Sequence, residues 1–110
     1  MKQPNSFVEI LEFLVAPEQQ MAFIEADQEV WTVGFDKYPA FDRKEVWVSV
    51  ERPDLVICVI YWHSRSGWKA ISEQELQELG MAFDRAFPHP YKLVKEKEYR
   101  KIYQPVLPVR

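Results

Sequence analysis

The sequence has 110 residues, which is long enough for one hydrophobic core and too short for two. Hydrophobic residues make up 47% of it and charged residues 28%, a balance that excludes an intrinsically disordered chain. The formal net charge of -3 excludes the basic surface that binding to a nucleic-acid backbone requires. We therefore expect residues 1–110 to form a single globular domain that does not bind nucleic acid.

The N-terminal segment and the single cysteine indicate where the protein is located. Residues 1–6 contain one charged residue with no apolar region behind it, so we expect no signal peptide. No apolar run approaches the roughly 20 residues of a membrane-spanning helix. Cys58 lies inside a predicted buried strand and has no second cysteine with which to pair. We therefore expect a cytoplasmic protein with no membrane partner.

The first predicted element in chain order is a strand over residues 7–15. Both of its faces are apolar except for one carboxylate on each, Glu9 and Glu12. Side chains that alternate along a strand point to opposite faces, so these two carboxylates cannot converge on one substrate. We expect each of them to reach water near a strand end or a sheet edge.

A helix is predicted from Pro17 to about Lys37. Proline is favoured in the first turn of a helix, and apolar residues recur along this segment at spacings of three and four. Asp27 lies on the resulting apolar stripe and leaves two interpretations open. It is either a structural carboxylate at the margin of the stripe or an acid held against an apolar pocket, where it moves a proton.

Two strands follow, over residues 41–51 and 55–62. The first alternates between apolar and polar residues, and the connection between the two, Arg52-Pro53-Asp54, is short enough to predict an antiparallel hairpin. Residues 55–62 form the longest uninterrupted apolar run in the sequence, which predicts a buried strand. Because this strand is apolar on both faces, we expect helices to cover one face and a second copy of the chain to cover the other.

Two helices are predicted after the central strand. Ser64 is expected to cap a short helical segment over residues 65–71. Ser72 and Glu75 then form a capping-box pattern, which opens a longer amphipathic helix that ends before Pro88.

The final predicted element is a strand over residues 91–103, whose lysines are typical of an edge strand protected from aggregation. Residues 104–110 are either an arm that lies on a neighbouring molecule or a frayed end. The order strand, helix, strand, strand, helix, strand predicts an α+β domain of the ferredoxin-like βαββαβ type, with two helices on one face of a four-stranded antiparallel sheet. The apolar second face predicts a homodimer that packs sheet to sheet as a dimeric α/β barrel.

Several short motifs lie near the end of the first helix, at the entry to the second strand, and at the end of the third strand. They are Trp31, Pro39-Ala40-Phe41 before Lys44-Glu45-Val46-Trp47, and Tyr61-Trp62 before Ser64-Arg65-Ser66-Gly67-Trp68. On these residues the chain resembles the dimeric α/β-barrel superfamily that contains the antibiotic biosynthesis monooxygenase-like proteins. Within that superfamily, it is similar to a small uncharacterised bacterial family that carries the pattern Asp27, Trp31-Thr32 and Lys44 to Trp47.

Haem-degrading members of this superfamily use an Asn on the first strand, a Trp after the third strand and a His further along. Trp68 can take the place of that Trp. No Asn occurs over residues 7–15 and no His over residues 69–87, so the resemblance does not extend to haem cleavage. We expect no cofactor.

Three tryptophans and two histidines are the remaining candidates for a site. Trp31, Trp62 and Trp68 either fill the core or line a cavity that suits a flat apolar ligand. His63 follows the central strand and is either hydrogen-bonded to backbone or a general base at a pocket mouth. His63 and His89 are the only histidines and have no Asp or Glu partners at ligand spacing, so no metal site is predicted.

Two hypotheses of function remain. In the first, which the resemblance implies, the protein is a cofactor-independent oxygenase or a related enzyme that acts on a small aromatic or quinol-like substrate. The three tryptophans would then hold the ring, and Asp27 or His63 would move a proton so that oxygen can react with the resulting anion. In the second, the protein is a non-catalytic dimeric module that binds a ligand or has a structural role.

Overall fold

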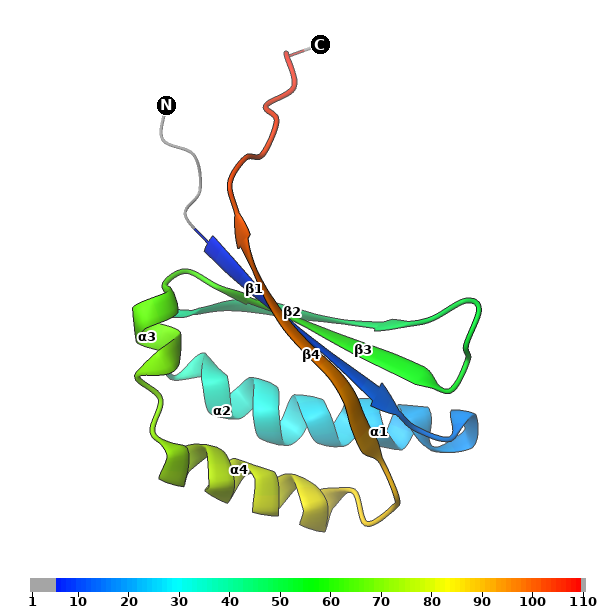
Figure 1. Ribbon diagram of the computed structural model, residues 1–110. Coiled ribbons are helices and arrows are strands. Elements are labelled where there is room, and N and C mark those ends of the chain that lie inside the picture. The colour runs from blue at the N-terminus through cyan, green and yellow to red at the C-terminus, as the bar shows by residue number, and fades with distance from the viewer. Residues whose placement is uncertain (1–5, 110) are drawn as a thin grey trace.

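The computed structural model describes residues 6–109 and contains a four-stranded antiparallel sheet with its helices on one face (Figure 1). The strands are β1 (Ser6–Leu14), β2 (Phe41–Val48), β3 (Leu55–Trp62) and β4 (Lys92–Lys101). They lie in the order β2-β3-β1-β4, so β1 and β3 are central and the other two strands are edges. This is the ferredoxin-like α+β topology that the sequence predicted. Residues 1–5, on which the prediction of no signal peptide rests, lie outside the described part of the chain.

The segment between β1 and β2 is helical, as predicted. It consists of η1 (Pro17–Gln19), α1 (Gln20–Asp27), η2 (Gln28–Thr32) and α2 (Val33–Asp36). The η2 segment is a turn of π-helix, in which the N–H of Val33 donates to the carbonyl of Gln28 five residues earlier. Such turns are frequent at functional sites. Here the π turn directly follows Asp27 and contains Trp31.

Two further helices lie between β3 and β4, and they are α3 (Arg65–Lys69) and α4 (Glu73–Ala86). Both begin at a serine cap that the sequence predicted. The hydroxyl oxygen of Ser64 accepts a hydrogen bond from the Gly67 N–H at 3.0 Å, and that of Ser72 accepts one from the Glu75 N–H at 3.1 Å. Because the first amides of a helix have no partner inside it, these bonds determine where each helix begins.

Two strands are shorter than the sequence predicted. β2 ends at Val48, because the N–H of Ser49 donates to the carbonyl of Leu55 and the Ser49 hydroxyl accepts from the N–H of Arg52, which together close the turn. β4 ends at Lys101, which pairs with the first residue of β1. Beyond that residue, none of the described residues of β1 remains for β4 to pair with.

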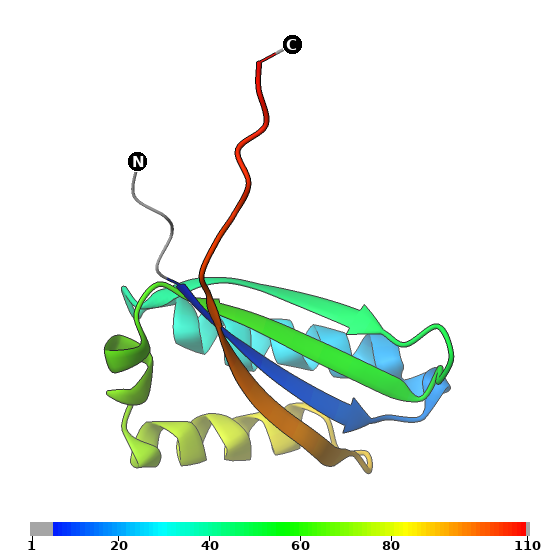
Figure 2. The ribbon, with the colours of Figure 1, turned by 45° about the horizontal axis from the view of Figure 1, so that its top comes forward.

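The core lies between the sheet and the helices (Figure 2). Alternate residues of β3 face the helices, and each is at most 2% exposed: Val56, Cys58, Ile60 and Trp62. From the helices, the Phe23 ring of α1 meets the rings of Phe83 and Phe87 with centroids 5.2 and 5.3 Å away. The Cys58 thiol is free and buried, as the sequence predicted.

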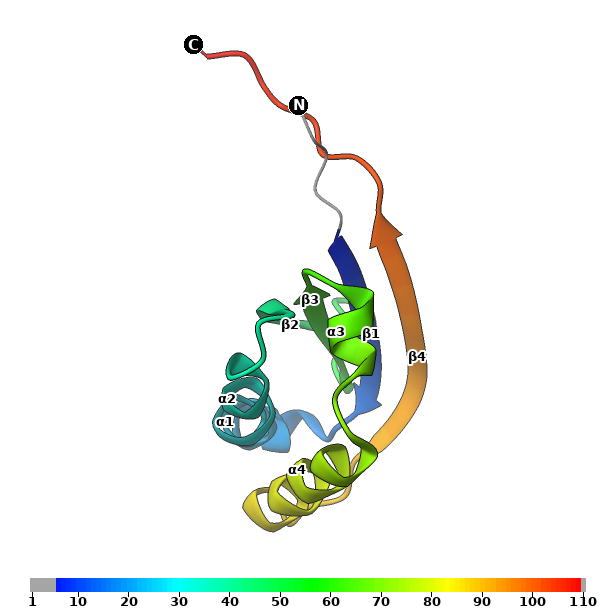
Figure 3. The ribbon, with the colours of Figure 1, turned by 90° about the vertical axis from the view of Figure 1, so that its left-hand side faces the viewer.

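The opposite face of the sheet, which we call the outer face, carries no helix (Figure 3). Its apolar and aromatic side chains are Val8, Ile10 and Leu14 of β1, Trp47 of β2, Leu55, Ile57, Val59 and Tyr61 of β3, and Tyr99 of β4. Trp47 and Tyr99 are 47% and 52% exposed. The pairing of this face with a second copy of the chain stays a prediction.

Residues 102–109 form no helix or strand and extend away from the sheet (Figures 1 and 3). Their apolar side chains are exposed, Val106 and Leu107 among them. Among residues 6–109, no helix combines the length and the apolar composition needed to span a membrane.

Candidate functional site

A cavity of about 410 Å³ lies between the helix-facing side of the sheet and the helices. Its walls are mostly apolar, and aromatic rings make up a large share of them, those of Phe13, Phe23, Trp31, Phe35, Trp68, Phe83 and Tyr91. Three charged side chains also line it, those of Glu9, Asp27 and Lys44. Its volume is in the range of small-molecule sites, and an apolar wall with a few polar groups is the usual composition of such a site.

The floor of the cavity is a row of residues that the strand register places side by side. Glu9 of β1 pairs with Ile60 of β3, and Ile60 pairs with Lys44 of β2. All three line the cavity. Neighbouring strands are roughly 4.8 Å apart, so the Cα atoms of Glu9 and Lys44 are separated by about 10 Å. The floor therefore has a carboxylate at one end, an ammonium group at the other and an apolar side chain between them.

Asp27 and Lys44 form a buried ion pair at the cavity wall. The Lys44 Nζ donates to Asp27 Oδ1 at 2.5 Å, and the Lys44 and Asp27 side chains are 5% and 7% exposed. The carboxylate comes from the last residue of α1, and the lysine comes from the middle of β2. A charge buried this deeply needs a partner, so each group holds the other in place.

The surroundings of Glu9 raise the pKa of its carboxyl group and so favour the neutral form. Burial raises its pKa, while a hydrogen bond from the Trp62 indole and the charges of Lys69 and Lys44 offset only part of that rise. The indole Nε1 donates to Glu9 Oε1 at 3.3 Å. A carboxyl group with a raised pKa that faces a cavity is suited to proton transfer.

The prediction that Glu9 lies near a strand end or sheet edge was wrong. β1 is a central strand, flanked by β3 and β4, so a residue in its middle has no edge to reach. Glu12, three residues further, points to the outer face, where Lys95 Nζ lies 3.8 Å from its carboxylate. The two carboxylates therefore lie on opposite faces of the sheet, as the alternation along β1 predicted, and the strand order keeps both away from an edge.

The three predicted tryptophans have different positions. Trp31 and Trp68 line the cavity. Trp62 is completely buried beneath them, and its ring is stacked on that of Trp68 with centroids 5.5 Å apart and planes inclined by 5°. Trp62 thus supports the Trp68 wall and holds the Glu9 carboxylate, while its own side chain does not line the cavity.

His63 lies outside the cavity. Its backbone N–H donates to the carbonyl of Ala40 at 2.7 Å, while the predicted hydrogen bond from the imidazole to backbone stays a prediction. Its imidazole is 60% exposed, with Nε2 3.9 Å from Asp42 Oδ1. The structure therefore brings Asp27, Trp31 and Trp68 to one cavity and leaves His63 on the surface.

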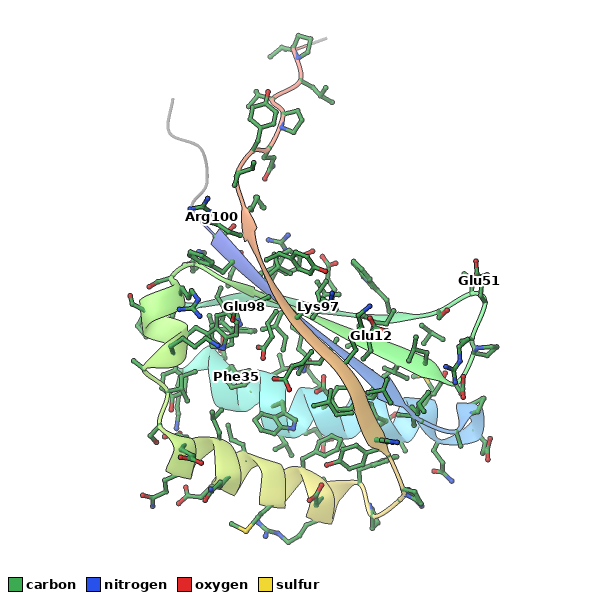
Figure 4. The ribbon with its side chains drawn as sticks, viewed as in Figure 1. Glu12, Phe35, Glu51, Lys97, Glu98 and Arg100 are labelled. Atoms are coloured by element: carbon green, nitrogen blue, oxygen red, sulfur yellow. The ribbon has the colours of Figure 1, made fainter. Side chains whose placement is uncertain are left out.

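A smaller hollow of about 120 Å³ adjoins the cavity beneath α3 and beside β4. Glu9 and Trp68 line both spaces, so they lie at the boundary between them. Glu98 of β4 holds α3 over this boundary, with Arg65 Nη2 and Lys69 Nζ at 2.8 and 3.1 Å from its carboxylate (Figure 4).

Residues 6–109 contain no group of three or more His, Cys, Asp or Glu side chains placed to hold a metal ion.

No protein-family model and no curated protein matches the chain. Solved structures do match it. A monooxygenase from the gene ActVA-Orf6 of Streptomyces coelicolor, in complex with the ligand nanaomycin D, has a TM-score of 0.68 at 19% identity, over 96% of this chain and 95% of that one. SnoaB, a cofactor-independent oxygenase from Streptomyces nogalater, has a TM-score of 0.60 at 13% identity, over 94% of this chain and 98% of that one. A candidate antibiotic biosynthesis monooxygenase from Bordetella bronchiseptica has a TM-score of 0.67 at 18% identity, over 90% and 99% of the two chains.

These similarities cover nearly the whole of both chains in each comparison, so they concern the complete domain and not one motif. The identities are too low to carry more than the fold. The chain therefore has the ferredoxin-like fold of the antibiotic biosynthesis monooxygenase-like proteins, as its sequence motifs implied.

Proposed function

We propose that the protein is an oxygenase-type enzyme that acts, without a cofactor, on a small aromatic or quinol-like substrate held in the cavity. The observation that supports this most is the combination of aromatic walls with a carboxylate of raised pKa, Glu9, in one cavity. Two proteins of the same fold, SnoaB and the monooxygenase crystallised with nanaomycin D, are oxygenases.

In this proposal Glu9 is the general base. It takes a proton from an activated CH₂ group between aromatic rings, and the resulting anion transfers one electron to O₂. The organic radical and superoxide then combine to form a C–O bond, and the hydroperoxide loses water to leave a carbonyl group. The balance is R₂CH₂ plus O₂ giving R₂C=O plus H₂O, so no external reductant is required.

The other residues around the cavity have supporting roles in this proposal. Trp31 and Trp68 hold the aromatic ring of the substrate between them and the sheet. Asp27 contributes by fixing Lys44 at the wall. The proton-transfer role predicted for His63 stays a prediction, and its exposed imidazole makes Glu9 the stronger candidate.

The test is oxygen consumption with anthrone, a flat aromatic compound with one activated CH₂ group. With ¹⁸O₂, the wild-type protein should form anthraquinone that carries one ¹⁸O atom. Glu9→Gln keeps the shape of the side chain and removes the base, so the rate should fall by about 10²- to 10⁴-fold. Glu12→Gln, on the other face of the same strand, is the matched control and should retain the rate.

Two results would contradict the proposal. An unchanged rate in Glu9→Gln would show that this carboxylate is not the base. Binding of anthrone without oxygen consumption would favour the alternative, a dimeric ligand-binding module.

A further inference from the structure

We propose that the Asp27–Lys44 pair is a subsite for a ligand hydroxyl group, and that the cavity selects weakly acidic phenols and enols by stabilising their ionised oxygen. This rests on the proposed function only in taking the cavity as the ligand site. It adds a substrate class, because an aromatic wall alone does not distinguish a phenol from a plain arene.

Lys44 has hydrogen-bond donors to spare. An ammonium group has three, and among the described residues only Asp27 accepts a hydrogen bond from Nζ. The lysine lines the cavity and its side chain is 5% exposed, so a ligand in the cavity meets an ammonium group that is largely shielded from bulk water. Hydrogen bonds from an ammonium group to an anionic oxygen are among the stronger ones in proteins.

The row across the floor fixes the position of such a ligand. A flat ring that lies over Ile60 has Lys44 on one side and Glu9 on the other. Its hydroxyl oxygen then points to the ammonium group, while the carboxylate can accept a proton from the opposite side of the molecule. The separation of about 10 Å between the two Cα atoms leaves room for an aromatic ring between the side chains.

The charge balance of the subsite favours weak acids over permanent anions. Asp27 neutralises most of the Lys44 charge, so a carboxylate or phosphate would bring an uncompensated charge into an apolar cavity. A phenol instead enters neutral and releases its hydroxyl proton to water, and the Lys44 ammonium group beside its oxygen stabilises the anion that forms. Burial raises the pKa of Cys58 and of Tyr91 to about 12 each, so neither residue supplies a competing anion near neutral pH.

The test uses three probes of similar size: 4-nitrophenol, nitrobenzene and 4-nitrobenzoate. Phenolate absorbs at longer wavelength than phenol, so absorbance reports the ionised fraction of the bound ligand directly. The variant is the double substitution Asp27→Leu/Lys44→Met, because replacing a whole buried pair with apolar residues preserves folding, whereas removing one partner leaves a buried charge. Circular dichroism and urea unfolding check that it folds.

We expect the wild-type protein to bind 4-nitrophenol and nitrobenzene and to exclude 4-nitrobenzoate. In the double variant, the ratio of bound phenolate to bound phenol at a fixed pH should fall by roughly tenfold, the effect of one charge-assisted hydrogen bond. The affinity for nitrobenzene should stay within about twofold in the same variant, since no charge is involved in binding it.

Three results would overturn the proposal: an unchanged phenolate ratio in the double variant, tighter binding of 4-nitrobenzoate than of 4-nitrophenol, or equal losses for nitrobenzene and the phenol. Neither readout involves oxygen. A protein that stabilises phenolate through Lys44 but never consumes oxygen would therefore refute the proposed oxygenase and leave this subsite intact.

Discussion

Glu9 shows how one side chain acquires its chemistry from its neighbours. Its position in the centre of the sheet removes water from the carboxylate, and no cation lies close enough to reverse the effect, since Lys69 and Lys44 offset it only in part. The uncharged Trp62 indole donates a hydrogen bond to the carboxylate. This bond orients the Glu9 side chain without neutralising its charge. The result is a base that is oriented but incompletely stabilised in its charged form.

This state of Glu9 predicts a gain of stability from a substitution that removes activity. The pKa of Glu9 is higher in the folded protein than the ordinary value of 4.5. Between those two pKa values the folded state holds more protons than the unfolded state, so the free energy of unfolding falls as pH rises through this range. Glu9→Gln removes this pH-dependent loss of unfolding free energy. The variant should therefore be more stable than wild type at pH 7, and the difference between the two proteins should be smaller at pH 4.

Urea unfolding of both proteins between pH 4 and pH 8 measures this difference. Glu12→Gln is the control, since that carboxylate lies on the outer face near Lys95 and is not enclosed by the cavity. A wild-type protein that gains stability over Glu9→Gln as the pH rises would mean that the folded protein stabilises the charged carboxylate, which is the opposite of the environment described here.

At the scale of elements, α3 is held close to the entry of β2. A Cβ atom added at Gly67 of α3 would lie 2.6 Å from the Cβ of Ala40, which cannot move without its backbone. Nothing comparable limits Gly80 in α4, where an added Cβ would meet only the Trp31 ring at 3.9 Å. A glycine is therefore required at Gly67, because α3 and the entry of β2 approach each other closely there. No such approach requires a glycine at Gly80.

The two positions give a paired prediction. Gly67→Ala should destabilise the protein by about 1–2 kcal/mol, because the clash with Ala40 displaces α3 and with it the Trp68 wall. Gly80→Ala should stabilise it by about 0.5–1 kcal/mol through the better helix propensity of alanine. Thermal unfolding of both variants measures the difference. Equal gains in the two would show that α3 is free to move away from β2.

The elements were predictable from sequence because their signals are local. Ser64 and Ser72 begin helices where their caps indicated, and the apolar run of β3 is buried. The candidate site was predictable only in part. Asp27 was singled out because it interrupts an apolar stripe, but its partner Lys44 lies 17 residues away on another element. Glu9 was missed because its environment depends on which strands flank β1.

The same limit explains the tryptophans. Trp31, Trp62 and Trp68 were grouped because each has the size and spacing of a core or cavity residue. Which of the three lines the cavity depends on how the helices pack on the sheet. In this packing Trp62 is stacked against Trp68 and does not line the cavity. Residue type thus identified the neighbourhood of the cavity, while strand order and layer packing determined its lining.

For the whole molecule, the outer face is a sheet surface that no helix of the described residues covers (Figure 3). Its central strands carry apolar residues, Ile10 and Ile57 among them, with Glu12 beside Ile57, and its edge strands carry further charged residues. At one margin the Arg43 guanidinium lies 3.8 Å from the centre of the Tyr61 ring, and the Tyr61 hydroxyl lies 3.3 Å from a Glu45 carboxylate oxygen. An apolar centre with a polar rim is the composition of protein interfaces, and monomers rarely expose such a face. We propose that two copies pack through it.

A charge placed at the centre of this face should separate the copies. Ile57→Lys is suited to the test, because Ile57 is flanked by Glu12 and Trp47, so the new ammonium group has a carboxylate neighbour within the monomer. Native mass spectrometry and sedimentation at micromolar concentration should find a dimer for wild type and a monomer for this variant. Met81→Lys, at an exposed position on α4 in the helical layer, is the control and should remain a dimer. A wild-type monomer would refute the pairing, whereas a dimeric Ile57→Lys would mean that the copies meet through another surface, because a lysine at the centre of a dry interface has no water to solvate it.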